Sequence, residues 1–125
     1  MDESLIGEIS LGAAIKVHSA LGPGLLESAY EACLAHELEK RGLSVMKQVS
    51  LPLHYDGIKL DVGYKLDLLV ANSVVLELKT VEKLLPIHSA QLLSYLKLSG
   101  HRLGYLLNFN VVHMRDGIKR LVNGL

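Results

Sequence analysis

The sequence has few of the features that mark secreted or membrane proteins. Cys33 is the only cysteine of the 125 residues, which excludes an internal disulfide and a cysteine metal cluster and suits a reducing compartment. No uncharged apolar run approaches about 18 residues, so no membrane-spanning helix is predicted. Asp2 and Glu3 occupy the place where a secretory signal has basic residues. We therefore expect a cytoplasmic protein with no membrane partner.

An excess of charge of either sign is also absent. Thirteen basic and 13 acidic residues cancel, so binding to nucleic acid would have to depend on a local patch. Low-complexity tracts and repeats are absent, and 50% of the residues are apolar, which predicts one globular domain over residues 1–125. This apolar content is slightly higher than a monomer needs, so part of the apolar surface would suit a homodimer interface.

Apolar residues spaced three or four apart predict two helices, over residues 4–20 and 25–41. Pro23 and its two neighbouring glycines separate the helices, and Gly42 ends the second one. The second helix is expected to bury one face, formed by Leu26, Ala29, Tyr30, Cys33, Leu34 and Leu38.

The rest of the chain alternates between strand and helix patterns. We expect a strand over residues 45–55 with an edge or bulge at Pro52, and a third helix over residues 87–98 that begins near Pro86. The apolar run at residues 104–109 is typical of a strand buried on both faces. Asp-Gly pairs predict two turns, the second within a C-terminal hairpin over residues 111–122. Together, these predicted helices and strands indicate an α/β fold.

The most informative segment is a predicted hairpin that carries charge in otherwise apolar strands. Its strands cover residues 64–70 and 74–79. Asp67 lies within the first strand, and Glu77 and Lys79 lie two residues apart in the second. Because strand side chains alternate with a period of two, Glu77 and Lys79 share a face.

The length of the turn decides whether the charged residues meet. If the connection has three residues centred on Asn72, Val70 faces Val74, and Asp67 lies opposite Glu77. A two-residue turn would break this pairing.

Two carboxylates and a lysine at one place in a dry sheet need compensation. A divalent cation would supply it, because Mg²⁺ prefers carboxylate and water oxygens and leaves room for a substrate phosphate. Lys79 could then orient the attacking water or neutralise charge on the phosphate, as phosphodiester cleavage requires. The alternative is that Glu77 and Lys79 form only a solvated salt-bridge face.

Two helices add polar residues to this picture. Glu27 lies in the first turn of the second helix, where it either compensates the helix dipole or reaches a common place with Tyr30, three residues later. In the third helix, Gln91 and Tyr95 share a face.

Gly24, Glu27 and Tyr30 form the pattern Gly-x-x-Glu-x-x-Tyr, and over residues 5–122 the chain resembles the bacterial and archaeal GxxExxY proteins. The resemblance implies membership of the PD-(D/E)XK nuclease-like superfamily. That superfamily has a restriction-endonuclease-like αβββαβ core, a mixed sheet flanked by helices. Residues 25–109 follow this order, so the chain would add an N-terminal helix and a C-terminal hairpin.

Position by position, the resemblance implies that Asp67 and Glu77 are the metal-binding carboxylates, with Lys79 completing the Glu-x-Lys part of the motif. The main-chain carbonyl of Leu78 would join the metal ligands, and Glu27 matches the helical glutamate that supplements the site in many members.

Gln91 and Tyr95 are similar to the Gln-x-x-x-Tyr signature of RecB-type nucleases, whose glutamine and tyrosine flank the site. Leu66 stands where a proline usually precedes the aspartate. The leading hypothesis is a Mg²⁺- or Mn²⁺-dependent nuclease acting on DNA or, as the second choice, RNA. The alternative is a catalytically silent binding or dimerisation module, which the neutral charge, apolar composition and small size would suit.

Overall fold

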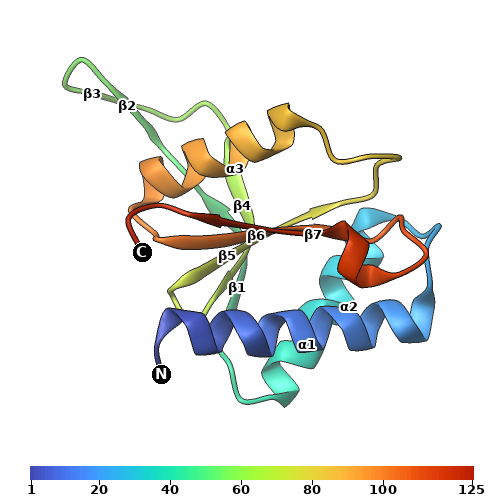
Figure 1. Cartoon of the computed structure of the whole chain (residues 1–125). Helices are drawn as coiled ribbons and strands as arrows, with labels where there is room; N and C mark the ends of the chain where they lie inside the picture. Colours follow the sequence, from blue (N-terminus) through green and yellow to red (C-terminus); the bar gives the residue numbers. More distant parts are fainter.

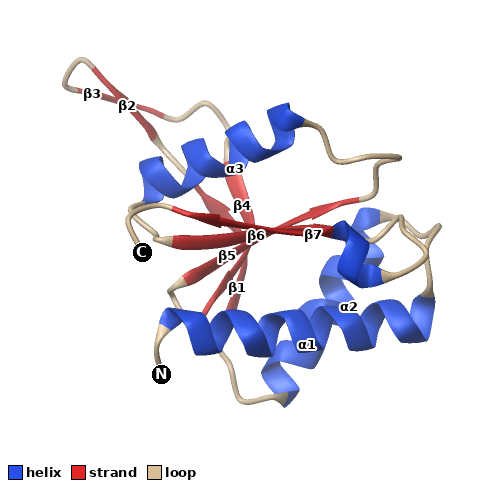
Figure 2. Cartoon of the chain, in the orientation of Figure 1, coloured by secondary structure: helices blue, strands red, loops and turns tan.

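The computed structural model describes all 125 residues as a mixed five-stranded sheet between two layers of helices (Figures 1 and 2). Helices α1 (Glu3–Leu21) and α2 (Glu27–Lys40) cover one face, and α3 (Pro86–Ser99) covers the other. In spatial order the strands are β1 (Val45–Ser50), β4 (Lys65–Val70), β5 (Val74–Lys79), β6 (Leu103–Asn108) and β7 (Ile118–Val122). The predicted α/β class and the αβββαβ core order are confirmed.

Strand β5 is the one that joins the two kinds of pairing in the sheet. It runs antiparallel to β4 and parallel to β6. A parallel pair needs a long crossover connection, and α3 supplies it. Every residue of β6 is buried, as its unbroken apolar run predicted.

The core consists of one apolar cluster on each face of the sheet. Nineteen buried residues, including Leu68 and Leu76, form the cluster under α1 and α2. Eight buried residues, including Leu69 and Val75, form the cluster under α3. Neighbouring residues of one strand thus enter different clusters, because strand side chains alternate between the two faces.

Local chemistry fixes where the helices begin and end. The Asp2 carboxylate accepts a hydrogen bond from Leu5 N (2.8 Å) and caps α1. Pro86 is the first residue of α3, as predicted, and Gly100 ends that helix with a φ of +78°. None of these helices combines the length and the apolar character needed to cross a membrane.

The strand expected over residues 45–55 is interrupted at Pro52. Its last part forms a separate hairpin, which projects from the body of the protein beyond α3 (Figure 1). The two strands of this hairpin are β2 (Leu53–Tyr55) and β3 (Ile58–Leu60). Proline has no N–H to donate to the ladder with β4, which explains the break. The predicted Asp56-Gly57 turn is present, with φ values of +50° and +78°.

The C-terminal hairpin was predicted wrongly. Residues 111–113 form no strand, and a short 3₁₀ helix, η1 (Met114–Gly117), leads into β7, which pairs with β6. Gly117 does not have the positive φ of a hairpin turn. A side chain there would place its Cβ against the carbonyl oxygen of Asn108, so close backbone approach explains this glycine.

The buried face of α2 also differs from the prediction. Tyr30, Leu34 and Leu38 are buried as expected, but Cys33 is exposed on the side that faces α1. Leu26 is 77% exposed because α2 begins only after it.

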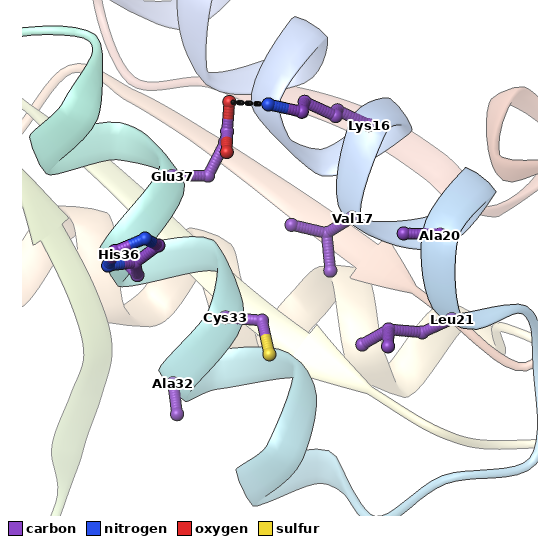
Figure 3. A pocket seen from close by; sticks show the side chains of 8 residues that line it. All are labelled: Lys16, Val17, Ala20, Leu21, Ala32, Cys33, His36 and Glu37. Atoms are coloured by element: carbon purple, nitrogen blue, oxygen red, sulfur yellow. Dashed lines mark hydrogen bonds and ion pairs between the residues drawn. The ribbon is translucent and has the colours of Figure 1, made fainter.

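Cys33 lines a hollow of about 320 Å³ between α1 and α2 (Figure 3). The ion pair between Lys16 Nζ and Glu37 Oε1 (3.1 Å) borders this hollow. The hydrogen bond from Lys16 lowers the pKa of Glu37.

Candidate active site

The β4–β5 hairpin has the predicted register at its turn. Val70 pairs with Val74, so the connection has three residues, and its first two, Ala71 and Asn72, have φ values of +50° and +51°. The ladder continues as far as Leu68 and Leu76.

Beyond Leu68 and Leu76, hydrogen bonds from the backbone to side-chain carboxyl groups take the place of the backbone ladder between β4 and β5. Asp67 N donates a hydrogen bond to Glu77 Oε1 (3.0 Å), and Leu78 N donates one to Asp67 Oδ2 (2.9 Å). Each carboxyl group is therefore held by the backbone of the opposite strand. This arrangement brings the two predicted metal-binding carboxyl groups together and fixes their orientation.

Burial controls the charge of Glu77, which is only 4% exposed. Burial raises the pKa of its carboxyl group to about 9, and the negative charge of Asp67 contributes in the same direction. The backbone hydrogen bond from Asp67 and the charge of Lys79 act in the opposite direction but are smaller. Without a cation, Glu77 is therefore protonated at neutral pH.

Glu27 approaches the carboxyl pair from the first turn of α2. Its pKa is raised, mainly by burial and then by the charge of Asp67. Glu27 and Asp67 line one pocket of about 260 Å³. The complete lining of this pocket is Glu27, Ser28, Glu31, Gln48, Asp67 and Leu78. Dipole compensation alone does not describe Glu27, because the charge of Asp67 also acts on its carboxyl group.

Helix α3 brings Gln91 and Tyr95 to the same end of β5. Lys79 Nζ donates a hydrogen bond to Gln91 Oε1 (3.1 Å). Tyr95 is 9% exposed, and its pKa is raised by burial and then by the nearby carboxyl group of Glu77. Gln91 and Tyr95 line a second hollow of about 300 Å³ together with Tyr64. The six predicted site side chains thus lie around the end of the β4–β5 pair that is opposite the turn, which we call the open end. They are Glu27, Asp67, Glu77, Lys79, Gln91 and Tyr95.

The chemistry of this site suits a cation held by oxygen atoms. No three His, Cys, Asp or Glu side chains form a ready-made metal-binding group. When both are ionised, Asp67 and Glu77 offer two carboxylates whose repulsion a cation would relieve, and Glu27 and Leu78 line the same pocket as Asp67. A set of few protein oxygens fits Mg²⁺ or Mn²⁺, which keep water among their ligands.

A family model described as the PD-(D/E)XK nuclease superfamily matches residues 4–121. The chain belongs to this superfamily. Comparisons with curated proteins and with solved structures found no match. The GxxExxY resemblance and the Gln-x-x-x-Tyr signature at Gln91 and Tyr95 stay predictions.

In this PD-(D/E)XK protein, Tyr30 does not reach the pocket that Glu27 lines. Tyr30 is fully buried, and its ring stacks on Phe109 with a centroid distance of 4.5 Å. Its hydroxyl donates to Gly22 O and accepts from Leu25 N (3.2 Å). The expectation that Glu27 and Tyr30 reach one place was therefore wrong. Tyr30 instead anchors the connection that leads into α2.

Sequence reasoning missed Gln48 and Glu31, which also line the pocket. Gln48 Nε2 donates to Glu31 Oε1 (2.6 Å) and approaches Asp67 Oδ1 (3.4 Å). The only signal that could have identified Gln48 is the register between β1 and β4, which involves residues distant in sequence. A polar residue in a strand gives no such indication by itself.

Proposed function

We propose that the protein is a metal-dependent nuclease that hydrolyses phosphodiester bonds in DNA, with RNA as the second choice of substrate. The observation that carries the proposal is the pair of interlocked carboxyl groups of Asp67 and Glu77 at the open end of β4 and β5, with Lys79 on the same strand as Glu77. Membership of a nuclease superfamily supports this assignment.

The cation would be Mg²⁺ or Mn²⁺, held by Asp67, Glu77 and the carbonyl of Leu78, with Glu27 supplementing the site. Such an ion would supply Lewis-acid activation of the phosphate and of the attacking water. To hold such a cation, Glu77 would have to be in its carboxylate form, because only that form binds a cation well.

The remaining residues act on the substrate and on the attacking water. The Lys79 ammonium group is held by Gln91 and neutralises negative charge that builds on the phosphate, or orients the water. Tyr95 and Gln91 shape the neighbouring hollow and hold a phosphate oxygen through their donor groups. Attack of water on phosphorus breaks one P–O ester bond and leaves a phosphomonoester and a free hydroxyl group.

The proposal is tested by incubating the purified protein with a labelled DNA or RNA oligonucleotide in Mg²⁺, Mn²⁺ or EDTA. We expect cleavage with a divalent cation and none with EDTA. The matched variant is Glu77→Gln, because glutamine keeps the size and neutrality that Glu77 has at neutral pH but cannot become a carboxylate. Its cleavage rate should fall by about 100-fold or more.

Undiminished cleavage by Glu77→Gln would reject the site. A wild-type protein that cleaves neither nucleic acid with either cation, yet forms a tight dimer in light scattering, would favour the silent binding module instead.

A further inference from the structure

We propose that Gln48 is a positioning residue that holds the Asp67 carboxylate in the orientation needed for cation binding. This inference rests on the proposed function. It starts from an unusual backbone conformation in β1, next to the pocket that Glu27 and Asp67 line.

The backbone of Gln48 departs from the strand that contains it. Its neighbours pair regularly with β4, Lys47 with Leu68 and Val49 with Leu66, so Gln48 faces Asp67. Its φ is nevertheless +50°, in the left-handed region that side chains other than those of Asn, Asp and His rarely adopt. A conformation of this kind persists only where the surrounding structure enforces it, and such conformations concentrate at functional sites.

The Gln48 side chain lies between two carboxylates. Its amide Nε2 donates to Glu31 Oε1 at 2.6 Å and approaches Asp67 Oδ1 at 3.4 Å. The short bond to Glu31 fixes the amide, and the amide then faces Asp67. As a neutral donor toward both acidic groups, it reduces the repulsion between their charges.

With Gln48 in place, both oxygens of Asp67 face a donor. Oδ2 accepts from Leu78 N and Oδ1 faces the Gln48 amide, so the plane of the carboxylate is fixed. Each carboxylate oxygen has two lone pairs, so one on each oxygen stays available for a cation. Second partners of this kind commonly change metal affinity or activity by about 10- to 100-fold when they are removed.

The decisive variant is Gln48→Gly, because glycine adopts a φ of +50° without strain while the amide is lost. We expect a melting temperature of the metal-free variant equal to or above that of the wild type. Calorimetry should show Mn²⁺ affinity about tenfold lower, and kcat on the oligonucleotide should fall with little change in KM. A residue with only a structural role would instead lower the melting temperature and leave Mn²⁺ affinity unchanged.

The second variant, Gln48→Met, keeps the length of the side chain but has no donor. It should also bind Mn²⁺ about tenfold more weakly, and it decides the question if Gln48→Gly fails to fold. Wild-type Mn²⁺ affinity in either folded variant overturns the role of Gln48 while leaving the nuclease proposal intact. A wild-type protein that neither binds Mn²⁺ nor cleaves nucleic acid overturns the nuclease proposal and, with it, this role.

Discussion

The two ends of the β4–β5 pair are built in opposite ways. At the turn end, Val70, Val74 and Leu76 are fully buried and the ladder is regular. At the open end, the side chains of Asp67 and Glu77 take the place of ladder bonds. Apolar burial at the first end stabilises the fold, whereas burying carboxyl groups at the second end is unfavourable until a proton or a cation compensates them. One hairpin thus combines an end that stabilises the fold with an end where burial of two carboxyl groups opposes it.

The largest expected difference concerns two adjacent residues of β5. Leu76→Ala should lower the free energy of unfolding by about 2 to 5 kcal/mol, because it leaves a cavity in the core under α1 and α2. Glu77→Gln should instead raise it, by on the order of 3 kcal/mol at pH 7, because the wild-type carboxyl group stays protonated in the folded protein but ionises in the unfolded chain. Urea unfolding of both metal-free variants measures this contrast. Equal losses of stability would show that the two ends do not differ.

The open end should also make stability depend on pH. The pKa of Glu77 is raised from 4.5 to about 9, so its contribution to stability is complete below about pH 4.5 and is lost as the pH rises through about 9. The charges of Asp67 and Lys79 act on the pKa of Glu77, and the charge of Glu77 in turn raises the pKa of Tyr95.

Between about pH 6 and pH 8, metal-free wild-type protein should therefore lose stability on the order of 1 kcal/mol per pH unit relative to Glu77→Gln. Urea unfolding at several pH values measures the difference. Parallel curves for the two proteins would contradict the protonated state of Glu77.

A smaller effect is expected where the chain leads into α2. Tyr30→Phe should lower the free energy of unfolding by about 1 to 2 kcal/mol, because Gly22 O and Leu25 N lose their partner. Tyr105→Phe is the matched control, since the Tyr105 ring is also buried but its hydroxyl makes no hydrogen bond within the protein. Thermal unfolding of both variants tests the assignment, and equal melting temperatures would refute the anchoring role of Tyr30.

Local patterns predicted the pairing of Asp67 with Glu77 on the condition that the turn has three residues, which the structure shows it has. Once the turn has three residues, the pairing of Val70 with Val74 sets the register towards Asp67 and Glu77, because all of these residues lie within one hairpin. The position of Pro86 at the start of α3 was predictable for the same reason.

Features that depend on distant parts of the chain could not be predicted. Gln48 meets Asp67 only because β1 pairs with β4, and its positive φ leaves no trace in the sequence. Gly117 was interpreted as a turn residue, although it is needed where its backbone passes Asn108. Cys33 appeared apolar enough for the core, but it lies beyond the buried face of α2.

The central claim is that the carboxyl groups at the open end of the hairpin form a cation site. Titration of Mn²⁺ into metal-free protein at neutral pH, followed by calorimetry, tests it most directly. We predict saturable binding to the wild type and affinity at least about tenfold lower for Glu77→Gln, with both proteins folded. Absence of binding to the wild type, or equal affinity in the two proteins, would contradict the claim.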